Sequence, residues 1–108
     1  MEAFNYCVIS TTTETKENAD AITQLLLEKK LVACVQSTTI QSTYHWQGKI
    51  ENSKEILLQM KTKRSLFKQI GLEIEQLHSY KVPEIIMIPV MDANTSYLQW
   101  IEDMTISI

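Results

Sequence analysis

The chain has 108 residues and a net charge of −3, with 44% hydrophobic and 21% charged residues. These values predict one globular domain over residues 1–108, without the basic surface that nucleic acid or an anionic membrane requires. The first residues lack a basic segment followed by an apolar one, and no apolar run approaches about 18 residues, so we expect neither an export signal nor a membrane span. Two cysteines make no disulfide framework, which favours a reducing, cytoplasmic location.

The first predicted elements are a strand over residues 4–10 and a helix over residues 16–30. The strand is apolar and rich in residues that favour sheets. Threonines at 11–13 and 15 offer hydroxyl groups for a helix N-cap, and Ala19, Ile22 and Leu26 recur at helical spacing.

A long two-stranded ribbon is predicted over residues 31–62. Its returning arm alternates Ile56, Leu58 and Met60 with polar residues, the pattern of a half-buried strand, and Gly48 suits the turn. Fifteen residues from 32 to 46 would span about 50 Å, whereas a globule of this size has a radius of gyration of about 13 Å. Either bulges break the ribbon or it leans on another subunit.

A second amphipathic helix is predicted over residues 64–78, a short strand over 84–91 and a last helix around Trp100. Pro89 cannot donate to a sheet, which places part of the last strand at an edge or bulge. The order β-α-β-β-α-β plus a C-terminal helix predicts an α+β, ferredoxin-like fold with a long hairpin. Two helices would cover one face of the sheet and leave the other bare.

Several chemistries that this fold hosts lack their residues here. An RNA-recognition module needs aromatic residues on the third strand, and none occurs between Ile56 and Met60. An acyl-phosphate hydrolase needs an arginine in the first strand–helix loop, whereas Arg64 lies elsewhere. No glycine-rich phosphate loop, Cys-x-x-Cys pair or nucleophile–base pair is found, so we predict a protein that is not an enzyme.

The candidate site residues each have a structural alternative. Cys34 offers a soft metal ligand if it is exposed, or a small buried apolar group. His78, at a predicted helix end, is a ligand or a capping histidine. Tyr80 and Glu84 flank Pro83 and form either a pocket lip or a packed turn. Trp46, near the ribbon tip, is hard to bury within one chain and predicts contact with a neighbouring subunit or the ribbon base.

The chain resembles the CutA divalent-cation tolerance proteins in motifs that occur in the family's order and spacing. The matching segments are Lys-Leu-Val-Ala-Cys-Val at 30–35, Tyr-His-Trp-Gln-Gly-Lys-Ile-Glu at 44–51, Lys-Thr at 61–62, His-Ser-Tyr-Lys-Val-Pro-Glu-Ile at 78–85 and Tyr-Leu-Gln-Trp-Ile at 97–101. The resemblance implies a ferredoxin-like domain in a tight homotrimer with strands shared between subunits. It also implies a role in tolerance of divalent metal ions, copper in particular.

The resemblance points to copper or another divalent cation as the cofactor, with His78 and Cys34 as ligands. Ser10 and Leu77 stand where some family members carry a cysteine and a second histidine, so we expect weak binding. In the predicted sheet order the strand that follows Cys34 and the strand that follows His78 lie at opposite edges, so a shared site would lie between subunits. The alternative is a trimeric signalling or scaffold module that binds a small molecule or a protein in its inter-subunit clefts.

Overall fold

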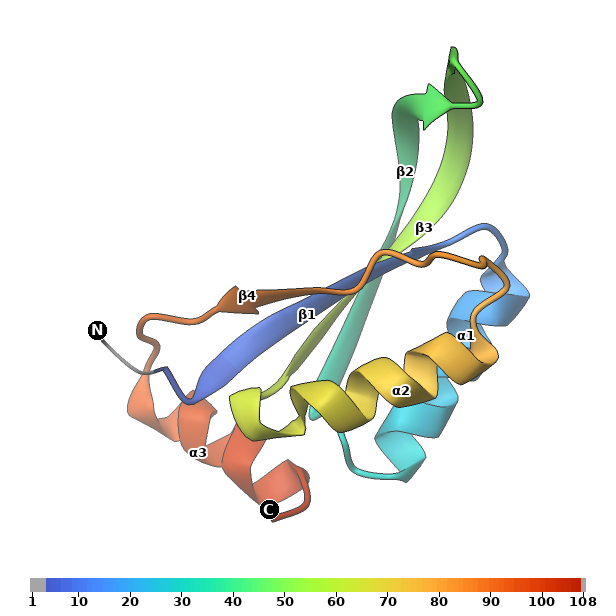
Figure 1. Ribbon diagram of the computed structural model, residues 1–108. Coiled ribbons are helices and arrows are strands. Elements are labelled where there is room, and N and C mark those ends of the chain that lie inside the picture. The colour runs from blue at the N-terminus through green and yellow to red at the C-terminus, as the bar shows by residue number, and fades with distance from the viewer. Residues whose placement is uncertain (1–3, 108) are drawn as a thin grey trace.

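Four antiparallel strands form one sheet in the computed structural model, which describes residues 4–107. In chain order the elements are β1 (Tyr6–Thr13), α1 (Lys16–Glu28), β2 (Cys34–Trp46), β3 (Lys49–Lys63), the short 3-10 helix η1 (Arg64–Leu66), α2 (Phe67–Leu77), β4 (Ile86–Pro89) and α3 (Thr95–Met104). The strand order β2-β3-β1-β4 confirms the predicted ferredoxin-like fold (Figure 1). Within the described residues, every helix falls short of the length and apolarity that a bilayer crossing demands.

The hydrophobic core lies between the sheet and the helices α1 and α2, which lie side by side on one of its faces (Figure 1). Alternate residues of the central strands point into this core, and they are fully or almost fully buried together with the apolar stripes of both helices. The core members are Cys7, Ile9, Ala19, Ile22, Leu26, Leu31, Val32, Leu58, Met60, Leu66, Ile70 and Ile74. The period of two in β3 and the helical spacing in α1 therefore place the core as predicted.

The strand β1 is longer than predicted at its C-terminal end. Thr11 and Thr13 are buried within it, and Thr13 is the last residue paired with β3. The cap of α1 is Thr15, whose Oγ1 accepts the backbone N–H of Asn18 at 3.1 Å. Of the candidate hydroxyls, three thus belong to the strand and one caps the helix.

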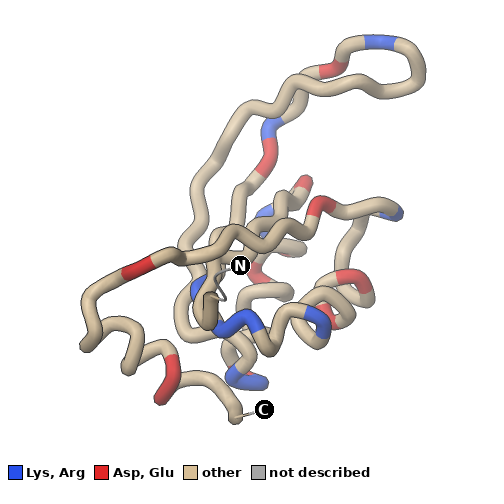
Figure 2. Tube along the Cα trace, turned by 60° about the vertical axis from the view of Figure 1, so that its left-hand side comes forward, with Lys and Arg blue, Asp and Glu red and all other residues tan. Residues whose placement is uncertain are grey.

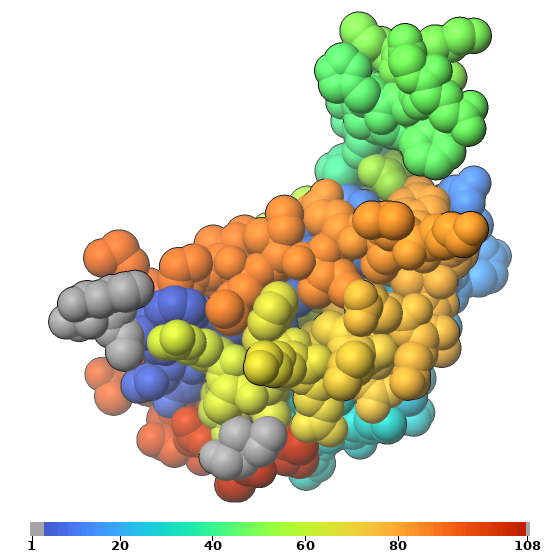
Figure 3. Space-filling view, viewed as in Figure 1, coloured from blue at the N-terminus to red at the C-terminus, as the bar shows by residue number. Residues whose placement is uncertain are grey.

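The hairpin of β2 and β3 projects beyond the rest of the sheet. The pairing of β1 with β3 ends at Thr13 and Ile56, whereas β2 and β3 continue through seven further pairs, from Ile40 with Glu55 to Trp46 with Lys49. The turn residues Gln47 and Gly48 both have positive φ, 49° and 76°, as a type I′ turn requires. In Figures 1 and 3 this hairpin stands clear of the body, which confirms the long ribbon.

Among residues 4–107, the helix α3 covers one end of the second face of the sheet. Lys63 Nζ lies 2.9 Å from Glu102 Oε2 and 2.8 Å from the carbonyl oxygen of Ile106, and the Tyr6 hydroxyl donates to Glu102 Oε1 at 3.1 Å. These hydrogen bonds from Lys63 and Tyr6 hold the pKa of Glu102 below its ordinary value. The remainder of this face, called the open face below, is the bare surface that the element order predicts.

Candidate functional site

One row of residues crosses the open face and includes Cys34. The register aligns Cys34 with Lys61, Lys61 with Val8, and Val8 with Ile88. Because Ile9, Met60 and Met87 point into the core, their neighbours in this row point to the opposite face. Ile88 at the far edge is 45% exposed.

The two cysteines differ in what can reach them. Cys7 is fully buried in the core, and burial raises the pKa of its thiol to about 11, so it stays protonated. Cys34 is a half-buried free thiol at the start of the edge strand β2. Of the two thiols, only Cys34 is placed where an ion could approach it, and Cys7 is a core residue.

The imidazole of His78 is held at both nitrogens. His78 is the C-cap residue of α2, as predicted. Nδ1 accepts the backbone N–H of Tyr80 at 3.0 Å, and Nε2 lies 2.7 Å from the carbonyl oxygen of Thr12. A carbonyl oxygen only accepts, so Nε2 carries the proton and Nδ1 has its lone pair engaged. A metal ion would have to displace one of these hydrogen bonds to reach His78.

The side chain of Tyr80 contacts the base of the hairpin on the open face of the sheet. Its hydroxyl donates to Glu55 Oε2 at 2.7 Å, and its ring lies 5.0 Å from that of His78. Burial, then the hydrogen bond to Glu55 and the charge of that carboxylate, raise the pKa of Tyr80 above its ordinary value. Glu55 is only 8% exposed, so the Tyr80 hydroxyl supplies a hydrogen bond that its buried carboxylate needs. The sequence analysis did not single out Glu55, because its partner lies 25 residues away.

His78 and Cys34 do not meet within one chain. The Thr12 carbonyl that His78 contacts lies in the row of Leu57 and Thr38, four residues along β2 from Cys34. That offset corresponds to about 14 Å along the strands and about 10 Å across them, whereas metal–ligand bonds are about 2 Å long. Among residues 4–107, no group of three or more His, Cys, Asp or Glu side chains is positioned to hold a metal ion.

The other candidate residues lie on the surface of the single chain. Trp46 is 59% exposed next to the hairpin turn, so neither the ribbon base nor the core covers it. Glu84 is exposed in the segment that leads into β4. The structure therefore joins Tyr80 to Glu55 and to His78, while Trp46 lies at the far end of the hairpin.

Three comparisons with known proteins agree with one another. The family model of the "CutA1 divalent ion tolerance protein" matches residues 7–104. The divalent-cation tolerance protein CutA of Pyrococcus horikoshii is 37% identical over 98 residues, which cover 91% of this chain and 96% of that protein.

Solved structures extend the likeness to the whole fold. The CutA1 crystal structure from the psychrotrophic bacterium Shewanella sp. SIB1 superposes with a TM-score of 0.94 at 34% identity and covers 98% of this chain and 100% of that one. The CutA1 structure from Oryza sativa gives a TM-score of 0.93 at 32% identity, covering 97% of both chains. With a family model that spans nearly the whole sequence and these structural matches, the chain belongs to the CutA1 divalent ion tolerance protein family.

Proposed function

We propose that this protein acts in the tolerance of divalent metal ions as a homotrimer that binds a divalent cation weakly, with copper as the first candidate. Membership of the divalent ion tolerance family is the observation that carries the proposal. We further propose a cytoplasmic, non-catalytic role, which fits two free thiols and the lack of a nucleophile–base pair in the sequence.

The surface of the single chain supports assembly. Seven pairs of the hairpin extend past β1, and an isolated two-stranded ribbon is marginal in water. On the opposite edge of the sheet, Ile86 and Ile88 of β4 are 48% and 45% exposed. Further copies of the chain would cover both features. Light scattering at micromolar concentration should give about three times the 12.5 kDa chain mass, and a monomer would contradict the assembly.

The proposed metal ligands are Cys34 and His78 from different copies. Cys34 supplies the soft donor that copper prefers. His78 binds an ion only after it releases the backbone N–H of Tyr80 or the carbonyl oxygen of Thr12, and that exchange lowers the net affinity. Weak binding follows from this competition as well as from the small number of donors.

The test is a calorimetric titration of the purified protein with Cu(II) and with Zn(II). Cys34→Ser and His78→Ala should each weaken binding. The chain offers matched controls, because His45→Ala removes the histidine on the hairpin and Cys7→Ala removes the thiol in the core. Both controls should bind as the wild type does. Equal binding by all four variants would remove Cys34 and His78 as ligands.

A second candidate function is a scaffold or signalling module. The exposed aromatic residues of the hairpin favour it, since Trp46 is 59% and Tyr44 is 42% exposed. In this reading a small molecule or a protein binds in clefts between subunits, lined by Trp46, Tyr80 and Glu84. A Trp46→Ala variant that binds metal normally but loses a partner captured by the wild type would favour this role over the first.

A further inference from the structure

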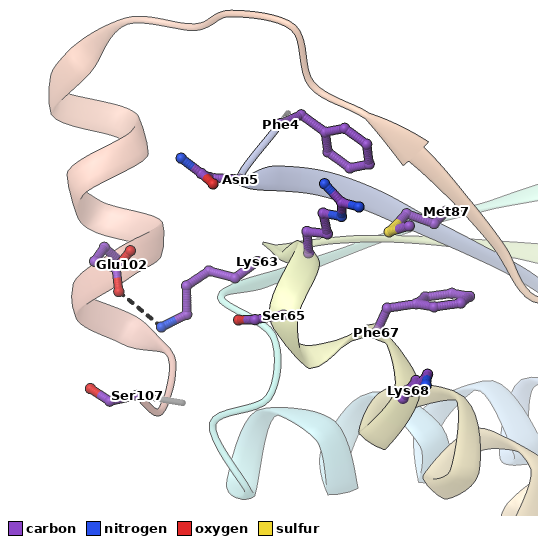
Figure 4. Close-up of a pocket in the computed structure, with 10 residues that line it drawn as sticks. Phe4, Asn5, Lys63, Ser65, Phe67, Lys68, Met87, Glu102 and Ser107 are labelled. Atoms are coloured by element: carbon purple, nitrogen blue, oxygen red, sulfur yellow. Dashed lines mark hydrogen bonds and ion pairs between the residues drawn. The ribbon is translucent and has the colours of Figure 1, made fainter. Parts of the chain in front are cut away.

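A cavity of about 720 Å³ lies on the opposite side of the molecule from the hairpin tip, where β3 runs into η1 and α2 (Figure 4). Its volume lies within the range of about 300–1,000 Å³ that is typical of small-molecule sites. The cavity is open to solvent; its basic residues come from the end of β3 and the following helical segment, and α3 lies along one side. We call it the basic cavity; it is lined by Phe4, Asn5, Lys63, Arg64, Ser65, Phe67, Lys68, Met87, Glu102 and Ser107.

The lining of the basic cavity has a net positive charge, whereas the whole chain has a net negative charge. Acidic residues outnumber basic ones in the sequence by 13 to 10, whereas the lining holds three basic residues and one acid. That acid, Glu102, is already paired with Lys63 at 2.9 Å, as the dashed line in Figure 4 shows. Two positive charges, on Arg64 and Lys68, are left over. Figure 2 shows this concentration of basic residues in blue at the junction of β3 and α2.

Arg64 and Lys68 have no compensating partner among residues 4–107. Neither takes part in the ion pairs or side-chain hydrogen bonds of that part of the chain. Arg64 begins η1 and Lys68 lies in the first turn of α2, so two exposed cations line the same cavity. A bound anion would offset this excess of positive charge.

The guanidinium of Arg64 is also oriented by its surroundings. Its Cζ atom lies 4.7 Å from the centroid of the Phe4 ring. Stacking on an aromatic face uses the flat side of the guanidinium and leaves the N–H donors at its rim for a planar or tetrahedral anion. Phe67 and Met87 supply apolar wall next to this position, as Figure 4 shows.

We propose that the basic cavity binds a small organic phosphate monoester. The phosphate, which carries close to two negative charges at neutral pH, matches the two uncompensated cations Arg64 and Lys68. The apolar body of the ligand lies against Phe4, Phe67 and Met87. This site is distinct from Cys34 and His78, and it does not depend on the proposed metal binding.

The first test is a titration of the purified protein with phenyl phosphate, followed by the amide NMR shifts of Asn5, Ser65 and Phe67. Phenol and inorganic phosphate are titrated in parallel, because each represents one half of the ligand. Saturable shifts at these amides, with phenyl phosphate bound more tightly than either half, support the proposal. Lack of saturation, shifts centred elsewhere, or equal affinity for inorganic phosphate would overturn it.

The second test uses charge-removing variants. Arg64→Gln and Lys68→Gln should each weaken phenyl phosphate binding by about tenfold, as expected for the loss of a charge-assisted hydrogen bond. Lys54→Gln is the matched control, because Lys54 is an exposed lysine on the hairpin. If Arg64→Gln fails to fold, Arg64→Lys replaces it and should still weaken binding, since lysine lacks the planar fork. Affinities equal to that of Lys54→Gln would contradict the site.

Discussion

The Tyr80 hydroxyl donates a 2.7 Å hydrogen bond to Oε2 of Glu55, and this contact joins the turn after α2 to the base of the hairpin. Glu55 forms the first pair of the hairpin beyond the end of β1. The same turn is tied to β1 through His78 and the carbonyl oxygen of Thr12. Two side chains of one turn thus fix where the projecting hairpin leaves the sheet.

Removing the Tyr80 hydroxyl should destabilise the protein. Tyr80→Phe leaves the buried carboxylate of Glu55 without its donor, which should cost about 1–3 kcal/mol of unfolding free energy. Urea unfolding at one fixed protein concentration measures the change. Tyr44→Phe is the control, because that hydroxyl meets Ser53 in an exposed contact at 3.2 Å, and its effect should stay within about 0.5 kcal/mol. Equal effects of the two substitutions would contradict the buried contact.

The burial of Tyr80, together with this hydrogen bond, predicts a loss of stability in alkali. The fold raises the pKa of Tyr80, so it favours the neutral phenol over the phenolate. The stabilisation is therefore complete below the ordinary tyrosine pKa of about 10 and declines as the pH rises above it. Between pH 9 and 11 the wild type should lose more unfolding free energy than Tyr80→Phe. Parallel pH profiles for the two proteins would show that Tyr80 does not contribute this dependence.

His78 should be observed as the tautomer with its proton on Nε2. The carbonyl oxygen of Thr12 requires a donor at Nε2, and the N–H of Tyr80 requires an acceptor at Nδ1. Long-range ¹H–¹⁵N NMR correlations of the neutral imidazole distinguish the two tautomers directly. A proton on Nδ1 would refute the hydrogen-bond arrangement described for this turn.

Trp46 should stabilise the assembly rather than the single chain. It is 59% exposed within one chain, so Trp46→Ala removes few contacts there. If a neighbouring copy buries it, the substitution should cost about 3–5 kcal/mol and raise the protein concentration at which the assembly dissociates. Dilution followed by light scattering measures this. An unchanged dissociation midpoint would place Trp46 outside any subunit interface.

Gly48 should be the residue of the hairpin turn least tolerant of a side chain. Its φ is 76°, which residues with a Cβ adopt at a cost of about 1–2 kcal/mol. Gly48→Ala should therefore lower the melting temperature, whereas Gly71→Ala, in the helix α2 and with open space around its position, should raise it or leave it unchanged. A melting temperature equal to the wild type for Gly48→Ala would mean that the turn changes type.

The periodicities in the sequence predicted the arrangement of the elements, because burial imposes them directly. The alternation of Ile56, Leu58 and Met60 predicted which face of β3 packs against the helices. Pro89 predicted that β4 lies at an edge of the sheet. Thr11 and Thr13 were harder to place, since threonine suits both helix caps and strands.

Contacts between distant residues could not be predicted in the same way. His78 was a candidate metal ligand from its position alone. Only the fold reveals that one of its nitrogens is hydrogen-bonded to the carbonyl oxygen of Thr12, 66 residues earlier. The local sequence pattern does not indicate the contact of Tyr80 with Glu55 either. A carboxylate on a strand is expected to be exposed to solvent unless its partner is known.

The hairpin has a mechanical consequence for the molecule. Its seven pairs beyond β1 make an arm of about 24 Å, held at its base by Tyr80 and Glu55. A rotation of about 10° at that base would carry the tip through about 4 Å at this arm length, roughly the spacing between two neighbouring strands. A rotation of that size would displace Trp46 far enough to alter which surface it meets.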